Sequence, residues 1–347
     1  MVRRPSATIV QAILSGDPGL EAALEHNLTV VERAPFLWLV DASDDEALRI
    51  CEAIAARRPD RDVSVLRMPP APGETNPKTF KLRLAEDRVT TEALVVLDDD
   101  TALTAAGYAA LLDALGWSEL STGLPSYAPG RDLFSSLVAH FVNDNAALTY
   151  LCVCALTAPV SISGMCYALR TETLRAFGGF RAIERVLADD LAIARAVRAR
   201  GGRLYQTIEP HRTATSVTSL RRYIGLMHRW FLFATLLFES ERPTVKIMLA
   251  GLYLLPPAAL LTLAALALVA PSATGFGALG AVVLIRRAVI ADVQRRTLGE
   301  PRSAWGVSLL AEALQPFHAL HGACVRTIRW RSKRYRVRAN DAFVQIA

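Results

Sequence analysis

The chain has 347 residues and a formal net charge of +6, a length that suits one large domain or two smaller ones. Apolar residues make up 52% of it and the mean hydropathy is +0.27, which is high for a soluble enzyme, so the excess has to be located. The five cysteines include no CxxC pair, which argues against a zinc site and indicates reduced thiols that face the cytosol.

Strands and helices alternate over residues 6–120. No signal peptide is expected before them, because the first residues run almost directly into a strand pattern. Strands that alternate with helices form parallel sheets with right-handed crossovers, and ligands of such sheets bind beyond the C-terminal ends of the strands. We expect strands at 7–14, 36–40, 62–66 and 94–97, and helices from Asp17, at 44–57, at 78–88 and at 104–116.

Acidic residues follow two of these strands. Asp41 ends the second, and Asp98, Asp99 and Asp100 follow the fourth in the segment EALVVLDDDTAL. One acid would be enough to cap the next helix, and three adjacent carboxylates repel one another, so the run favours a cation site over a solvated turn. Alternate residues of an extended chain point the same way, so we expect Asp98 and Asp100 to act together while Asp99 points away.

Residues 121–215 are less regular. The stretch 135–165 is apolar with few charges, which is consistent with either a core or a surface that meets lipid. An amphipathic helix is predicted at 186–200, with Asp189 and Asp190 in its first turn. Acids there also complement the helix dipole, so the pair alone does not prove a functional site.

The excess of apolar residues lies between residues 247 and 285, which include no charged residue over 39 positions. A spanning helix needs about 20 residues. We therefore predict a transmembrane hairpin, out over about 246–270 and back over about 275–293. Pro256 and Pro257 would kink the first helix, and Arg286 and Arg287 would extend to an interface.

Residues 304–325 contain Glu312, His318 and His321, so this segment is predicted to be an interfacial helix. Residues 326–338 are basic and interleaved with aromatics, and the positive-inside rule places them on the cytosolic side with the first domain. Their expected partner is anionic lipid headgroups and not nucleic acid. The expected domains are 1–240, 241–293 and 294–347.

The chain resembles the membrane glycosyltransferases of the GT-A fold, family 2-like, and most closely the ceramide glucosyltransferase group; hopanoid-associated glycosyltransferases are also similar. The resemblance implies an α/β, GT-A nucleotide-sugar-binding fold with a mostly parallel sheet and helices on both faces. C-terminal transmembrane and interfacial helices would follow. The segments that carry the resemblance are NPKTFKL (76–82), LDDDTAL (97–103), SGMCYALRTETL (163–174), LADDLAIARAVRARGGR (187–203), HRW (228–230) and TIRWRSKRYRVR (327–338).

Three departures from the group are visible. The usual N-terminal membrane helix is not seen, and the Arg-Trp motif, which usually begins with Gln or Arg, has Leu226 at that position. The first acidic site has a different offset, so either Asp41 or Asp44 would be the functional acid. The second departure puts recognition of the acceptor or the diphosphate in question.

On the donor side, the resemblance implies that Asp41 contacts uracil or ribose, and that Asp98 lies near the ribose or a metal. Asp100 would bind the metal, Mg²⁺ or Mn²⁺, which stabilises the leaving diphosphate. Lys78 could meet phosphate, although an exposed lysine is as consistent with the sequence.

Arg229 could bind the diphosphate, and Trp230 could stack on the sugar or anchor the chain at a membrane interface. On the acceptor side, Asp190 is the implied catalytic base. The implied acceptor contacts are Gly164, Met165 and Asp189.

The expected activity is an inverting transfer of a hexose, such as glucose, from a nucleotide sugar, such as a UDP-sugar, to the hydroxyl of a membrane lipid such as ceramide. The catalytic domain would face the cytosol. A polysaccharide synthase is a second possibility, although two membrane spans are too few to enclose a channel. A non-catalytic, membrane-anchored nucleotide-sugar-binding protein is a third.

Overall fold

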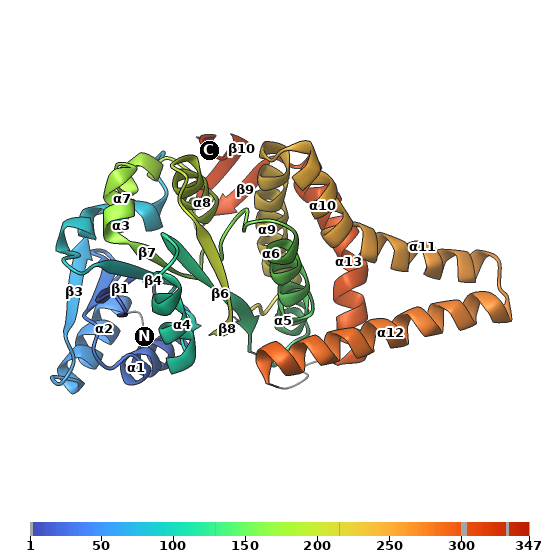
Figure 1. Ribbon diagram of the computed structural model, residues 1–347, viewed down its shortest axis with the longest axis horizontal. Coiled ribbons are helices and arrows are strands. Elements are labelled where there is room, and N and C mark those ends of the chain that lie inside the picture. Colours follow the sequence, from blue (N-terminus) through green and yellow to red (C-terminus); the bar gives the residue numbers. More distant parts are fainter. Residues whose placement is uncertain (1–2, 129, 215, 300–303, 331–332, 347) are drawn as a thin grey trace. The chain divides into compact units, whose positions relative to one another are not determined.

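The computed structural model describes residues 3–128, 130–214, 216–299, 304–330 and 333–346, which form two compact units (Figure 1). The first unit takes its residues from 1–128, 154–216 and 339–345, and the second from 129–153, 217–338 and 346–347. The strands are β1 Ala7–Ile13, β2 Phe36–Asp41, β3 Val63–Met68, β4 Ala93–Leu97, β5 Thr101–Ala102, β6 Leu120–Tyr127, β7 Cys166–Arg170, β8 Leu204–Thr213, β9 Thr327–Trp330, β10 Lys333–Ala339 and β11 Ala342–Ile346.

The helices of the first unit are α1 Leu20–Val30, α2 Asp45–Arg57, α3 Pro77–Ala85, α4 Ala105–Ala114, α6 Cys152–Leu156, which begins at the unit boundary, α7 Thr171–Ala176 and α8 Asp189–Ala199. Those of the second are α5 Leu133–Ala146, α9 Leu220–Ser240, α10 Pro243–Tyr253, α11 Leu255–Val269, α12 Ala273–Leu298 and α13 Trp305–Cys324. Short 3₁₀ helices lie at Glu86–Arg88 and Phe180–Ile183, and a π-helical turn lies at Ala147–Leu151.

In the described part of the first unit, eight strands form one sheet in the order β3-β2-β1-β4-β7-β6-β8-β5. Strands β1 to β4 pair in parallel, as predicted, but β7 is antiparallel to both β4 and β6. The reason is visible at its start: the carbonyl of Met165, just before β7, accepts a hydrogen bond from the amide of Asp98, just after β4 (2.9 Å). The chain therefore enters β7 at the edge where β4 ends, and the sheet is mixed, though mostly parallel.

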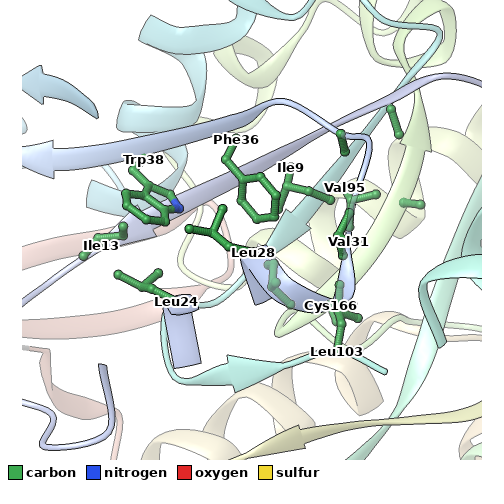
Figure 2. Packing of buried hydrophobic residues seen from close by; sticks show 14 of the residues in the cluster. Ile9, Ile13, Leu24, Leu28, Val31, Phe36, Trp38, Val95, Leu103 and Cys166 are labelled. Atoms are coloured by element: carbon green, nitrogen blue, oxygen red, sulfur yellow. The ribbon is translucent and has the colours of Figure 1, made fainter. Parts of the chain in front are cut away.

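The sheet is covered on both faces, so its central strands are apolar throughout and not alternating. Helices α1, α2 and α4 bury one set of apolar side chains against it, and α3, α7 and α8 bury another on the opposite face (Figure 1). Figure 2 shows the first cluster, in which Leu24 and Leu28 of α1 pack against Ile9, Phe36 and Trp38 of the sheet.

Several element boundaries follow the capping signals in the sequence. Asp44 caps α2 by accepting from the Ala47 amide, and Asn76 caps α3, which has Pro77 in its first turn. The helix expected from Asp17 begins instead at Leu20, because the Asp17 carboxylate accepts from the Gly19 amide and holds a turn before it.

In the second unit, α13 packs against α5 and α9. The segment 135–165, for which core and lipid surface were both open, begins as α5, whose Leu137, Val138 and Val142 are buried. The interfacial segment predicted at 304–325 is a helix. The basic segment 326–338 contains strands β9 and β10, which pair antiparallel with Tyr335 opposite Ile328. Arg331 and Ser332 of that segment lie outside the described residues.

Across the described residues, no single helix is both long and apolar enough to cross a membrane, but α10 and α11 together are, as a pair bent by 45°. The first arm of the predicted hairpin, about 246–270, is therefore two helices that meet at Leu254. Pro256 lies in the first turn of α11, where a proline lacks the amide hydrogen needed to continue the helix before it. Helices α11 and α12 lie side by side and run in opposite directions (Figure 1).

The predicted return arm, about 275–293, lies within α12, but its first arginine does not extend to an interface. Arg286 is paired with Glu312 of α13 and donates to Ser308 (3.0 Å) inside the unit. Arg287 lies over the ring of Trp305, 5.7 Å from the ring centre. A carboxylate on the neighbouring helix forms a charge-assisted hydrogen bond with the guanidinium. This pairing is stronger than the contacts that the side chain would make if it extended to a membrane interface.

We predict that Gly123→Ala destabilises the first unit. Gly123 lies where the β6–β8 register shifts, and a Cβ there would be 2.7 Å from Nδ1 of the buried His211. Overpacking of this kind costs about 1–3 kcal/mol, so the thermal unfolding midpoint should fall. Gly225→Ala is the control: nothing lies within 4 Å of its Cβ in α9, and helix propensity should raise stability by about 0.5–1 kcal/mol. An unchanged midpoint for Gly123→Ala would contradict the prediction and show that the His211 ring can move enough to accommodate the added methyl group.

Candidate active site

The C-terminal ends of β2 and β4 place acidic residues at one edge of the sheet. Asp41 is the last residue of β2, and its Oδ2 lies 3.0 Å from Nζ of Lys81. The Lys81 ammonium also donates to the carbonyl of Ile13, at the end of β1 (3.1 Å). Lys81 is almost fully buried, so a strong partner such as Asp41 is required to hold its charge inside the protein.

Helix α3 is attached at its start to the segment that precedes α8. The side-chain oxygen of Asn76 accepts from the amides of Lys78 (3.0 Å) and Thr79 (3.3 Å), and its nitrogen donates to the carbonyl of Leu187 (3.2 Å). Asn76 therefore joins two elements far apart in the sequence, and the Asn-Pro-Lys motif brings Lys78 to the acidic pair that opens α8.

The ammonium of Lys78 lies among three oxygen atoms. Its Nζ is 2.6 Å from Asp98 Oδ1, 2.7 Å from the carbonyl oxygen of Gly164 and 3.7 Å from Asp189 Oδ2. Although burial opposes the charge, Asp98 and Asp189 raise the pKa of Lys78 well above its ordinary value. The side chain is only 18% exposed, so Lys78 is an internal counter-ion and not the exposed lysine that the sequence left open.

The three adjacent aspartates have different surroundings. Asp99 Oδ2 accepts from the Leu14 amide (2.7 Å), which supports a structural role. Asp100 Oδ1 accepts from the Thr101 hydroxyl (3.1 Å), while burial and the charges of Asp98 and Asp99 raise the pKa of Asp100 to about 8. Of the three carboxylates, Asp100 is therefore the one whose charged form a bound cation would stabilise most.

Asp189 and Asp190 open α8, as predicted. Burial and the neighbouring Asp189 raise the pKa of Asp190 to about 7, although the Leu191 amide (2.7 Å) and Lys78 act in the opposite direction. A Cβ on Gly164 would lie 3.1 Å from Asp190 Oδ2, so glycine lets the loop before β7 approach this carboxylate closely. The structure thus brings Gly164, Asp98 and the acidic pair of α8 together around Lys78.

Met165 continues the same loop. Its sulfur accepts hydrogen bonds from the hydroxyls of Tyr127 (3.4 Å) and Thr213 (3.5 Å). Ser163, at the start of the loop, contacts Nε2 of His211 (3.3 Å). Sequence patterns did not single out Tyr127, His211 or Thr213, because their strands β6 and β8 are joined to the site only by tertiary pairing.

Lys81 was also missed, although a signal for it exists. Lys78 and Lys81 are three positions apart and so share one face of α3.

The structure also distinguishes the roles of the two candidate acids near β2, Asp41 and Asp44. Asp44 accepts from the amides of Ser15 (2.9 Å) and Ala47 (3.1 Å), and these bonds outweigh burial and lower its pKa. Asp44 thus serves as a helix cap, which leaves Asp41 as the candidate for ligand contact.

Arg229 and Trp230 lie on α9, in the second unit. The ring of Trp230 is stacked on that of Phe141 of α5, with centres 6.1 Å apart and planes at 27°. Its ring therefore already has an aromatic partner within that unit.

The residues present fit a divalent cation held with a diphosphate. Nowhere in the described ranges are three His, Cys, Asp or Glu side chains grouped as metal ligands. Asp98 and Asp100 nevertheless follow one strand end and remain partly exposed. Mg²⁺ is commonly bound by one or two carboxylates plus substrate phosphates and water, and this pair can supply that number of protein ligands.

The comparisons with known proteins give a family and a similar fold. The family model described as glycosyl transferase family 21 matches residues 2–343. No curated protein matches. A mannosyltransferase from Pyrobaculum calidifontis, solved in complex with GDP-Man and Mn2+, is 21% identical, with 91% of this chain and 88% of the other covered and a TM-score of 0.52. At this identity the likeness shows a shared fold.

We predict that Asp100→Asn weakens Mn²⁺ binding far more than Asp99→Asn. The amide oxygen introduced by Asp99→Asn can still accept from the Leu14 amide, whereas Asp100→Asn removes the charge that a cation needs. A loss of about tenfold or more is expected for Asp100→Asn and less than about threefold for Asp99→Asn, measured by titration calorimetry. Equal losses would contradict the assignment of Asp99 to a structural role.

Proposed function

The chain belongs to glycosyl transferase family 21, and on this premise we propose that it transfers a hexose from a nucleotide sugar to the hydroxyl of a membrane lipid, with inversion of the anomeric centre. The expectation of a glycosyltransferase is confirmed by the family, and the mixed, mostly parallel sheet is consistent with a GT-A fold. The single observation that supports an active site at this edge of the sheet is the meeting of Asp98, Asp189 and the Gly164 carbonyl around Lys78.

On the donor side, Asp98 and Asp100 would hold a divalent cation, Mg²⁺ or Mn²⁺, and Asp41 would contact the nucleoside. A bound cation supplies charge stabilisation for the diphosphate that leaves. The P. calidifontis enzyme was solved with GDP-Man and Mn2+, which supports a nucleotide-sugar donor and a divalent cation here. Glucose as the sugar and UDP as the nucleotide are proposed from the sequence motifs.

On the acceptor side, Asp190 would accept the proton of the attacking hydroxyl. A base is most effective when its pKa lies near the working pH, and the pKa of Asp190 is raised to about 7. Gly164 leaves room beside this carboxylate, because a side chain there would press on it. Attack from the side opposite the leaving group would give inversion.

A lipid acceptor, with ceramide as the leading candidate, is proposed from the apolar helices of the second unit. Large apolar side chains are exposed on α10 and α11, including Ile247 (75%), Leu268 (72%) and Val269 (83%). Such a surface is best explained by contact with lipid, and the basic residues after Val325 suit anionic headgroups. We propose that the enzyme is held in the membrane with its catalytic residues on the cytosolic side.

The test of this function is an incubation of the full chain with labelled nucleotide sugars, Mn²⁺ and a total lipid extract. The proposed enzyme labels a lipid and releases a nucleoside diphosphate in equal amount. Labelling of a long polysaccharide would favour a synthase, and absence of any nucleoside diphosphate would indicate a protein that only binds the donor.

We predict that Asp190→Asn lowers lipid glycosylation by about 10²–10⁴-fold, the usual contribution of a positioned base. Asparagine keeps the shape of the side chain but cannot take the proton, so donor affinity and the unfolding midpoint should barely change. Asp189→Asn should be milder. Turnover of Asp190→Asn near the wild-type rate would refute the assignment.

The same assignment predicts the pH dependence of the reaction. The base must be deprotonated, and the pKa of Asp190 is about 7, so the rate should rise with pH and level off above that value. A pH–rate profile of the wild type under saturating donor measures this. The rising limb should be absent from the residual activity of Asp190→Asn.

We also predict that the chain behaves as an integral membrane protein. Washing membranes with alkaline carbonate should leave it in the pellet, because exposed apolar helices bind lipid independently of charge. Release into the supernatant would contradict membrane insertion and indicate attachment through the basic segment.

A further inference from the structure

The hydrogen bonds of Lys78 are distributed unevenly. An ammonium has three donors, and two of them are used at short range, on Asp98 and on the Gly164 carbonyl. The second charged neighbour, Asp189, lies at 3.7 Å, which is too far for a hydrogen bond but close enough for strong electrostatic attraction.

The oxygen of Asp189 that faces Lys78 has no other hydrogen-bond partner. Its Oδ2 is buried and accepts no hydrogen bond in the described chain. The hydroxyl of Tyr167 is also buried without a partner, on the sheet face that packs against α3 and α8. A buried carboxylate oxygen without a donor is costly, so the structure holds an acceptor that a small shift of Lys78 would satisfy.

Asp98, in contrast, binds the divalent cation in the proposed function when the donor is present. A divalent cation at Asp98 and Asp100 would meet the Lys78 ammonium already bonded to Asp98. Two cations cannot share one carboxylate without strong repulsion in a partly buried site. The Asp189 oxygen offers the ammonium a position that keeps it paired.

We propose that Lys78 is a positioning residue that moves between two acids: it neutralises Asp98 in the donor-free enzyme and transfers to Asp189 when a divalent cation takes Asp98. This rests on the proposed function, because it assumes that donor binding includes the cation. The transfer brings positive charge to the acidic pair that contains the proposed base. Loading of the donor site would thereby be communicated to the acceptor side.

A double-mutant cycle tests this with Mn²⁺ alone, by titration calorimetry on the full chain without donor. Lys78→Met should tighten Mn²⁺ binding by about tenfold or more, because the competing ammonium is gone. Asp189→Asn should weaken it by about fivefold or more in the wild-type background, because Lys78 then has no second position. In the Lys78→Met background, Asp189→Asn should have no further effect.

The decisive outcome is the coupling. If Asp189→Asn weakens Mn²⁺ binding equally in both backgrounds, Asp189 acts by general electrostatics and the transfer is refuted. Unchanged Mn²⁺ affinity for Lys78→Met, with weaker donor binding, would likewise refute it and assign Lys78 to phosphate. Where Lys78→Met does not fold, Lys78→Gln, which keeps a donor for the Gly164 carbonyl, replaces it.

Lys81→Met is the matched control. It removes another buried cation from the same face of α3, but one that pairs with Asp41, so Mn²⁺ affinity should stay within about threefold of the wild type. The glycosylation assay separates the two proposals. A wild type that glycosylates lipid but shows additive effects refutes the transfer alone, and one that shows the coupling but labels no lipid refutes only the lipid acceptor. A wild type that binds no Mn²⁺ refutes the transfer.

Discussion

The ion pairs of Lys78 are the constraint on which the candidate site depends. This one ammonium bonds the end of β4 through Asp98 and the loop before β7 through Gly164, and it faces α8 through Asp189. Without a cation, the carboxylates at this edge would repel one another inside a partly buried space. Lys81, one turn later on the same helix, does the same for Asp41. Helix α3 thus supplies the positive charge that lets acids gather where ligands of such sheets bind.

Backbone geometry makes that convergence possible. Asn76 caps α3 and at the same time bonds to Leu187, so the helix that carries the cations and the helix that carries the acidic pair start close together. The antiparallel entry of β7 brings Gly164 and Met165 to the same edge. Glycine at 164 favours this approach, because a Cβ there would lie 3.1 Å from Oδ2 of Asp190. The hydrogen bonds of Asn76 satisfy polar groups that would otherwise be buried without a partner.

The second unit combines exposed apolar surface with an internal polar network. Asp144 of α5 accepts from Gln294 of α12 (2.8 Å) and from Ser308 of α13 (2.5 Å), and Arg286 joins Ser308 to Glu312. A buried network of hydrogen bonds and ion pairs costs much if one member is lost, so it specifies how these three helices pack. Large apolar side chains of α10 and α11 are exposed, whereas the polar network lies between α5, α12 and α13.

The sequence by itself determined the order of strands and helices over residues 6–120, because apolar runs, caps such as Asp44 and Asn76, and acids at strand ends are local signals. It also determined the kind of enzyme, since the motifs around Asp98, Asp190 and Trp230 carry the family resemblance. Only the tertiary structure decided that β7 runs antiparallel and that Lys78 is buried among acids. These features arise from contacts between residues far apart in the chain, where the geometry of packing, and not any local pattern, sets which charge meets which.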